Sequence, residues 1–235
     1  HTRYWRDWSS DVCSSDLSLA QTATGNTGSM IQLKDASGQI VVTGEDNKSI
    51  NTWLLKNFSK GNVVFTDGKN SSETSMNYSM LTGELCFMSE GLLYKVNKPV
   101  KKFSLTETTE NNSEQLRQFE NGFPAIDKNT PATFYELIFE GTKWIVLKYW
   151  YMQPRERTEY GGTTEKTFIT LSDYYLFNQS SNTLQFLGDR LSVKKLTKAM
   201  PELQSAIMQW VEKNPASMKA DADFVKLLHD IGGNP

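Results

Sequence analysis

The chain has 235 residues, of which 38% are hydrophobic, so it can form one large domain or two small ones with a substantial core. Its 25 basic and 27 acidic residues give a formal net charge of −2, which excludes a strongly basic nucleic-acid-binding surface and an acidic tail. The sequence holds no run of about 18 apolar residues, so we expect no transmembrane segment.

Residues 1–17 read as an artefact rather than as native sequence. Asp11 to Leu17 back-translates as GAC GTG TGC TCT TCC GAT CT, the text of a common sequencing adapter, and we interpret Arg6 to Leu17 as translated adapter. Such segments are excluded from fold reasoning. Residues 1–17 carry two arginines and three aspartates, so their removal changes the net charge from −2 to −1. They also hold Cys13, which leaves Cys86 without an intrachain disulfide partner.

Residues 18–29 are typical of the end of a secretory signal followed by a disordered, polar lead-in. In Ser18-Leu19-Ala20-Gln21, small residues occupy the first and third positions before a possible cleavage after Ala20. The sequence therefore predicts export, with a mature chain that begins at Gln21. The alternative is a fragment of a longer protein in which this tripeptide has no such role.

Residues 30–190 have the pattern of a β-rich body, in which short alternating or apolar runs are separated by turn residues. Met30–Leu33 and Gln39–Thr43 predict a first hairpin. A meander is expected after it, with turns at Asp67-Gly68 and Thr82-Gly83. Its strands are expected around Val63–Thr66, Met76–Met80, Glu84–Met88, Leu92–Val96 and Phe103–Leu105. The polar stretch Thr106–Glu114 predicts a linker or a long surface loop.

The most apolar hairpin of the chain is expected in the second half of this body, at Phe134–Phe139 and Trp144–Met152. Nearly every position of Trp144–Met152 is apolar or aromatic, which indicates a strand covered on both faces and central to the sheet. The charged, glycine-containing segment Gln153–Thr164 predicts a loop. Further strands are expected at Lys166–Leu171, Tyr174–Phe177 and Thr183–Leu187.

Residues 191–235 change to a helical period and are expected to pack on the body. Ser192 is suited to cap a first helix, and Pro201 to begin a second. A third helix is expected from about Asp221, closed by Gly232. The second and third helices carry amphipathic stripes able to dock on a sheet, formed by Leu203, Ala206, Ile207, Trp210 and Val211, and by Phe224, Leu227, Leu228 and Ile231.

No catalytic constellation, metal site or cofactor site emerges from the residue types. His229 is the one histidine outside residues 1–17, so a multi-histidine metal site and a Ser-His-Asp triad are poorly supported. We expect His229 to lie in the last turn of the third helix, where its charge suits the helix dipole. Cys86 lies between two apolar residues of a strand and is expected to be either a small packed side chain or an incidental exposed thiol.

An envelope hydrolase is the alternative function. Ser192-Val-Lys-Lys195 matches the S-x-x-K motif of serine acyl-transfer enzymes, although helix capping by Ser192 also explains the serine. Glycoside hydrolysis needs two carboxylates at a defined separation, and the acidic candidates cannot be ranked from sequence. They are Glu136, Glu140 and Asp173.

The aromatic residues carry the binding hypothesis. Alternation along a strand turns Trp150 away from Tyr149 and Tyr151, so one of these faces is expected to be incompletely covered. An exposed aromatic beside basic side chains can stack on a sugar ring or anchor a protein partner. The predicted ligand-binding residues are Trp150, Arg155, Arg157 and Tyr160. The competing interpretation is that both faces are core.

The chain resembles a group of exported Bacteroidota proteins without an assigned activity. The resemblance rests on Ser18–Gln21, Tyr78–Leu85 with its Thr-Gly-Glu turn, Phe134–Leu137 with Glu140-Gly141, Asp173–Tyr175 and the lysine-rich helical end. It spans much of residues 30–231 and implies a periplasmic or extracellular location and a strand-then-helix layout, but no site.

The prediction for the whole chain is an α+β fold, in which a mainly antiparallel, meandering or barrel-like sheet is followed by two or three carboxyl-terminal helices. The expected function is non-enzymatic binding or scaffolding in the cell envelope, with a protein or glycan ligand.

Overall fold

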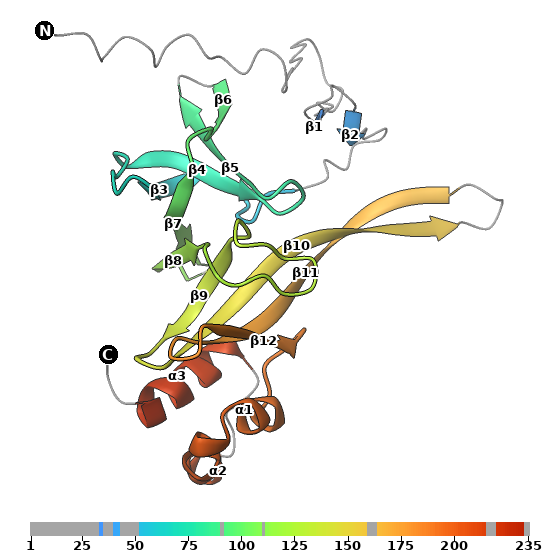
Figure 1. Ribbon diagram of the computed structural model, residues 1–235. Coiled ribbons are helices and arrows are strands. Elements are labelled where there is room, and N and C mark those ends of the chain that lie inside the picture. Colours follow the sequence, from blue (N-terminus) through green and yellow to red (C-terminus); the bar gives the residue numbers. More distant parts are fainter. Residues whose placement is uncertain are drawn as a thin grey trace, which may run out of the picture.

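The computed structural model describes residues 33–34, 40–42, 52–89, 92–109, 111–158, 164–214 and 220–232. They form a ten-stranded antiparallel sheet followed by three α-helices, which confirms the α+β class and the order of strands and helices. The sheet is not closed, so the fold is a meander rather than a barrel (Figure 1). From one edge to the other its strands are β12 (Thr183–Gly188), β11 (Thr164–Asn178), β10 (Trp144–Thr158), β9 (Tyr135–Glu140), β8 (Glu114–Glu120), β7 (Val100–Thr108), β3 (Ser59–Phe65), β4 (Thr74–Ser79), β5 (Glu84–Ser89) and β6 (Leu92–Lys95).

The strands predicted for the first half are confirmed. A separate antiparallel pair, β1 (Leu33–Lys34) with β2 (Ile40–Val42), confirms the first hairpin. Gly68 and Gly83 have φ of 80° and 72°, as the predicted turns require. The inward-facing side chains form one apolar cluster that includes Val63, Met76, Tyr78, Phe103, Leu105 and Phe119.

Two segments predicted as loops are strand over part of their length, where these predictions were wrong; residues 110 and 159–163 lie outside the described residues. Thr106–Glu114 holds the end of β7 and the start of β8, joined by a short turn in which the Thr109 amide donates to the Ser113 carbonyl. Gln153–Thr164 holds the end of β10, which runs to Thr158, and the first residue of β11. These strand ends carry mainly polar side chains and many of them are exposed, so the sequence lacks the apolar alternation that marks a half-buried strand.

Among neighbouring strands of the ten-stranded sheet, β8 and β9 share the fewest paired residues. These strands pair only at Phe119↔Glu136 and Glu120↔Tyr135, whereas β10 and β11 pair at fifteen positions. Side chains therefore contribute much of the contact between the two halves of the sheet. Among them, Phe134, Trp150 and Met152 of the second half pack against the apolar cluster of the first.

Strand β10 is covered on both faces over its first residues, as predicted. Val146 is fully buried in a cluster that includes the helices, and Leu147 is fully buried in a cluster on the opposite face. The second cluster includes Phe123 of the segment between β8 and β9, together with Tyr135 and Tyr175.

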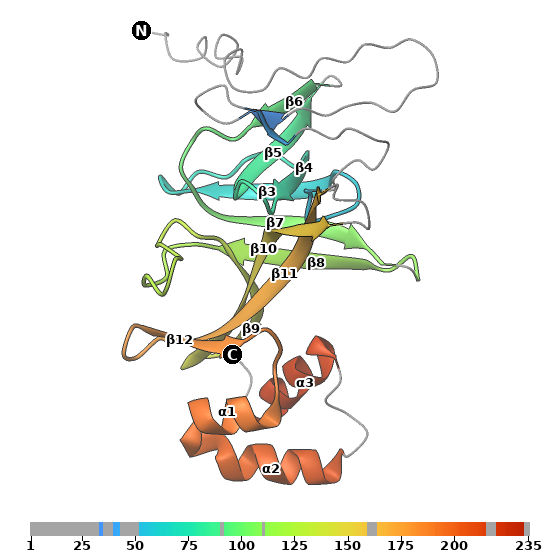
Figure 2. The same cartoon turned by 90° about the vertical axis from the view of Figure 1, so that its right-hand side faces the viewer.

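The helices α1 (Val193–Ala199), α2 (Gln204–Lys213) and α3 (Asp221–Gly232) lie at the β9–β12 end of the sheet (Figure 2). Ser192 caps α1 by accepting from the Lys195 amide at 3.3 Å. Pro201 begins a short 3-10 turn, η1 (Pro201–Leu203), that leads directly into α2. The predicted stripes are buried at Ile207, Trp210, Phe224, Leu227 and Leu228. None of the described helices is long and apolar enough to cross a membrane.

A two-stranded arm extends from the second half of the sheet. Pairing of β10 with β9 ends at Lys148, pairing of β11 with β12 ends at Tyr174, and these two residues face each other in the β10–β11 ladder. Beyond them, Tyr149–Thr158 and Thr164–Asp173 pair only with each other among the described strands. We call these residues the arm, and they project away from the rest of the sheet (Figure 1).

Candidate functional site

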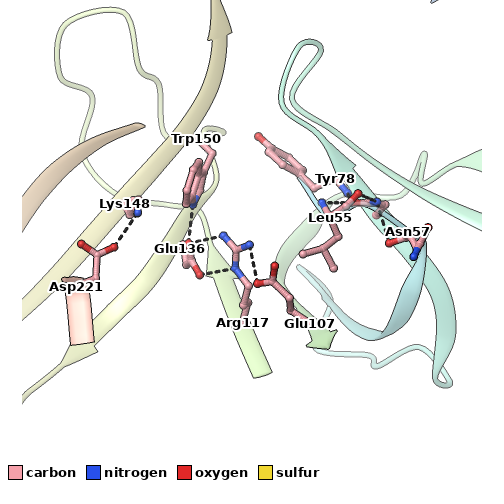
Figure 3. A network of polar contacts seen from close by, with 10 residues as sticks. Leu55, Asn57, Tyr78, Glu107, Arg117, Glu136, Lys148, Trp150 and Asp221 are labelled. Atoms are coloured by element: carbon pink, nitrogen blue, oxygen red, sulfur yellow. Dashed lines mark hydrogen bonds and ion pairs between the residues drawn. The ribbon is translucent and has the colours of Figure 1, made fainter. Parts of the chain in front are cut away.

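A row of charged and aromatic side chains crosses the sheet where its two halves meet (Figure 3). At its centre, Arg117 of β8 donates to Glu136 of β9 through two nitrogens, with Nε–Oε1 and Nη2–Oε2 distances of 2.6 and 2.8 Å. Both side chains are buried. The remaining Arg117 nitrogen, Nη1, donates to Glu107 of β7 at 3.2 Å. The bidentate geometry satisfies two charges that would each be costly to bury alone.

Trp150 of β10 joins this pair from the next strand. Its indole Nε1 donates to Glu136 Oε2 at 2.6 Å, so the carboxylate accepts from Arg117 and Trp150 together. The Arg117 guanidinium carbon and the Lys148 ammonium lie 5.2 and 4.2 Å from the centre of the Trp150 ring. Both cations therefore gain cation–π contacts in a partly desolvated place.

Lys148 extends the row to the helices. Its Nζ donates at 2.8 Å to Asp221, the first residue of α3. The hydroxyl of Tyr174 in β11 donates to the same carboxylate at 2.6 Å. Burial, together with the hydrogen bond and charge of Asp221, raises the pKa of Tyr174, which therefore remains protonated and able to donate.

These contacts form a polar seam, defined here as Glu107, Arg117, Glu136, Trp150, Lys148, Tyr174 and Asp221. Burial disfavours the charge of Arg117, but the hydrogen bond and charge of Glu136 and the nearby Glu107 outweigh it and raise the pKa of Arg117. The cation is thus held in place by its partners. The seam ties five strands and α3 together, and it contains no serine, cysteine or histidine that could act as a nucleophile or as an imidazole base.

Sequence reasoning missed the seam, although a signal for it exists. Glu136 and Lys148 are the charged residues within the apolar runs Tyr135–Phe139 and Trp144–Met152. Charged side chains in such strands are rarely fully buried unless they are paired. The sequence therefore indicates that Glu136 and Lys148 have charged or hydrogen-bonding partners in the fold, but it does not indicate which residues these are.

The predicted ligand-binding residues do not form one cluster. Trp150 is half-buried in the seam, whereas Arg155 is exposed in the arm, and the unbroken β10–β11 register puts them on opposite faces. The backbone of Arg157 lies in β10 opposite Glu165. Tyr160 lies outside the described residues. Ligand binding by these four residues stays a prediction.

Two aromatic residues of β10, Tyr149 and Tyr151, lie on the same face as Arg155. Tyr151 is the nearer of the two in sequence. It stacks on Tyr149 with a centroid distance of 5.2 Å and an interplanar angle of 13°. The Lys128 ammonium lies 4.5 Å from the centre of the Tyr151 ring. Burial, then the charge and hydrogen bond of Asp173, raise the pKa of Tyr151. We call this side of the arm the Tyr151 face; it comprises Tyr149, Tyr151, Gln153, Arg155, Thr167, Ile169, Leu171 and Asp173.

The residues of the predicted acyl-transfer motif have structural partners. The Ser192 hydroxyl accepts from the Lys195 amide as a helix cap, and the Lys195 ammonium donates to the Arg190 carbonyl at 2.8 Å. Cys86 is buried in β5, so of its two expected states the packed side chain is the one observed. His229 lies in the last turn of α3, where its ring contacts the Phe139 ring edge to face.

The acidic candidates are scattered. Glu136 is held in the seam, Asp173 lies on the Tyr151 face, and Glu140 is exposed at the end of β9. The structure does not assemble these three carboxylates around a common cleft. No group of three or more histidine, cysteine or acidic side chains that could hold a metal ion occurs among the described residues.

A small pocket of about 200 Å³ lies between the β9–β10 turn and the helices. Its lining is mainly apolar and includes Phe139, Met200, Leu203, Leu228 and Ile231. Its two ionisable lining residues, Lys143 and Glu202, form a 2.6 Å ion pair, which lowers the pKa of Glu202. Because each charge neutralises the other, this pocket offers no free acid or base.

Comparisons with protein-family models, with curated proteins and with solved structures find no match to this chain. Its function has to be inferred from its own residues.

Proposed function

We propose that this chain is a non-enzymatic binding or scaffolding protein of the bacterial cell envelope, in which the arm presents the binding surface. The observation that carries the proposal is the Tyr151 face. It combines partly exposed aromatic and aliphatic side chains with the exposed Gln153 and Arg155, on strand segments that pair only with each other among the described strands. Tyrosine and arginine are enriched in interfaces because they combine contact area with directional hydrogen bonds.

The rigidity of the second half of the sheet supports the same function. Lys148 and Trp150 anchor the base of the arm to Asp221 and Glu136. A binding surface that is held in one conformation loses less entropy when its partner binds.

The state of the candidate catalytic groups also favours binding over hydrolysis. An acyl-transfer serine needs a base within hydrogen-bond reach of its hydroxyl. Here the Lys195 ammonium donates to the Arg190 carbonyl, and the Ser192 hydroxyl is engaged in capping. Location in the periplasm or at the cell surface is supported by Ser18–Gln21, whose small residues suit signal cleavage.

The test is position-specific photo-crosslinking in the bacterium that carries the gene. A photoreactive residue replaces Gln153 or Arg155 in the arm, and the exposed Gln209 of α2 serves as the matched control. We expect a discrete envelope adduct from the arm positions and none from Gln209. Equal labelling from all three positions would refute the arm as the binding surface, and recovery of the protein in the cytoplasmic fraction would refute the location.

A further inference from the structure

We propose that the Tyr151 face of the arm binds a second copy of this chain, face to face and with the two arms antiparallel about a two-fold axis. This inference rests on the proposed function of the arm as a binding surface and names its partner. It is carried by the apolar centre of the face, by the placement of its two charges and by the blocked edge of β10.

The centre of the Tyr151 face is apolar. Tyr151 and Leu171 are cross-strand neighbours, followed by Gln153 and Ile169, and all of these except Gln153 are partly buried. A two-stranded ribbon is marginally stable by itself in water, so apolar side chains on its face gain from a covering layer. The opposite face already has one, because Trp150 and Met152 pack against the first half of the sheet.

The charges of the face are complementary to those of a reversed copy. Asp173 lies at its base beside Tyr149, and Arg155 lies toward its tip beside Thr167. Arg155 is six positions beyond Tyr149, so the two ends are separated by roughly 20 Å. In an antiparallel pair, Arg155 of each copy meets the end that carries Tyr149 and Asp173 in the other. The Lys128 ammonium, 4.5 Å from the centre of the Tyr151 ring, adds a positive charge to the face, and the adjacent Asp127 carries the opposite formal charge.

A parallel arrangement lacks this match. It would bring like ends together, so that Arg155 would meet the Thr167 end and Asp173 would meet the Tyr149 end of the partner. Isologous two-fold contacts require a self-complementary patch. For the two charged side chains that the structure describes on this face, Arg155 and Asp173, only the antiparallel arrangement brings opposite charges to the same end.

Pairing through the edge of β10 is blocked at Pro154. The Trp144 carbonyl accepts from the Gly141 amide on the β9 side, and alternation places the backbone groups of residues 146, 148, 150, 152 and 154 on that same side. The backbone nitrogen of Pro154 therefore faces away from β11, so its missing N–H removes no hydrogen bond to that strand. It does remove one hydrogen-bond donor from the outer edge of β10. Proline at such a position disfavours strand addition along the outer edge of β10.

The first experiment is sedimentation velocity of the purified chain over a wide concentration series. We expect a reversible dimer whose dissociation constant rises about tenfold or more in Arg155→Asp and in Asp173→Arg. The double variant, Arg155→Asp with Asp173→Arg, restores the opposite charges and is expected to recover the dimer. Lys226→Asp, at an exposed position of α3, is the control and should leave the dimer unchanged. Circular dichroism of each variant verifies the fold.

Cysteine crosslinking tests the orientation. The two-fold axis of the antiparallel pair passes between Tyr151 and Gln153, and sheets packed face to face lie about 10 Å apart, so Gln153→Cys is expected to form an intermolecular crosslink with a short bis-maleimide reagent. The two copies of Arg155→Cys would be roughly 20 Å apart and should not crosslink. Equal crosslinking at both positions would overturn the antiparallel arrangement.

The outcomes separate this inference from the proposed function. A chain that stays monomeric at all concentrations, or a dimer indifferent to both charge reversals, overturns self-association through the Tyr151 face. If envelope adducts still form from Gln153 in cells and contain a different molecule, the arm remains a binding surface. If neither a dimer nor an arm-specific adduct forms, both proposals fail.

Discussion

Arg117 of β8 and Glu136 of β9 form a buried, bidentate ion pair across the junction where the two halves of the sheet share only two residue pairs. This ion pair lies at the junction of the ten-stranded sheet that has the fewest paired backbone residues. Because Glu136 also accepts from Trp150, one carboxylate links β8, β9 and β10. The seam thereby fixes the second half of the sheet, and with it the base of the arm, relative to the first half.

Breaking this pair should destabilise the whole fold. Arg117→Met leaves the Glu136 charge buried without its main partner, and we expect a loss of about 3–5 kcal/mol in the free energy of unfolding. The combined variant Arg117→Met with Glu136→Leu removes both charges and should recover much of that loss. Urea unfolding monitored by circular dichroism measures both. An Arg117→Met loss no larger than that of the exposed control Lys101→Met would contradict the assignment.

The contact of Asp221 with Lys148 and Tyr174 should hold the start of α3 on the sheet. Asp221→Ala removes the acceptor for both groups, so we expect faster amide hydrogen exchange in α3 while β3–β7 keep their protection. Tyr174→Phe loses a single hydrogen bond and should cost about 1 kcal/mol. Asp230→Ala is unsuitable as a control because Asp230 accepts from Trp210. The exposed Glu212 of α2 serves as the control instead. If amide hydrogen exchange in α3 were as fast in Glu212→Ala as in Asp221→Ala, Asp221 would not be what holds the start of α3 on the sheet.

Stability should fall steeply at alkaline pH because several phenols are harder to ionise in the folded chain. Burial is the main cause that raises the pKa of Tyr78, Tyr174 and Tyr175, and it raises that of Tyr135 to about 12. The folded pKa values lie above 10.0, the ordinary pKa of a tyrosine phenol, so the contribution to stability is fully present below pH 10 and is lost as pH rises toward the folded values.

Each such tyrosine should lower the free energy of unfolding by about 1.4 kcal/mol per pH unit in that window. Phenolate absorbance at increasing pH, measured together with far-ultraviolet circular dichroism, checks this. Tyr135→Phe should make the fall of the unfolding free energy with pH shallower by the contribution of one proton, about 1.4 kcal/mol per pH unit. A smooth phenolate titration near pH 10 with the fold intact would contradict it.

Ser192→Ala distinguishes a cap from a catalytic serine. Loss of the hydroxyl that accepts from the Lys195 amide should cost about 1 kcal/mol of stability, whereas Ser192→Asp should retain the cap. Melting temperatures of the unsubstituted chain, Ser192→Asp and Ser192→Ala check this, and Ser192→Ala should have the lowest. If Ser192→Asp were as unstable as Ser192→Ala, capping would not explain the residue.

Gly61→Ala should be strongly destabilising because β3 and β7 approach closely there. A Cβ at Gly61 would lie 2.4 Å from the Ser104 carbonyl oxygen and 2.8 Å from the Met76 side chain. Overpacking of this kind costs about 1–3 kcal/mol. Gly232→Ala adds a Cβ at an ordinary 3.4 Å from Phe139 and is the matched control in thermal unfolding. Equal melting temperatures for the two variants would show that β3 and β7 can separate without cost.

The sequence by itself determined the class of the fold, most strand positions and all three helices. These features depend on local patterns, such as alternation before Asp67-Gly68 or the helical spacing of Phe224, Leu227 and Leu228, and their side chains occupy the predicted faces. Alternation also placed Trp150 opposite Tyr149 and Tyr151, as the register confirms. The local rules failed where strands carry mainly polar side chains, at the ends of β7, β8 and β10.

Only the tertiary structure decided the seam and the surroundings of the arm. Arg117 and Glu136 are separated by 19 positions, and Lys148 and Asp221 by 73, so no local pattern can pair them. Their partners are chosen by strand register and helix docking, which depend on burial of all the apolar faces at once. For the same physical reason Trp150, which the sequence offers as a candidate for ligand contact, is drawn into a charged network by residues distant in the chain.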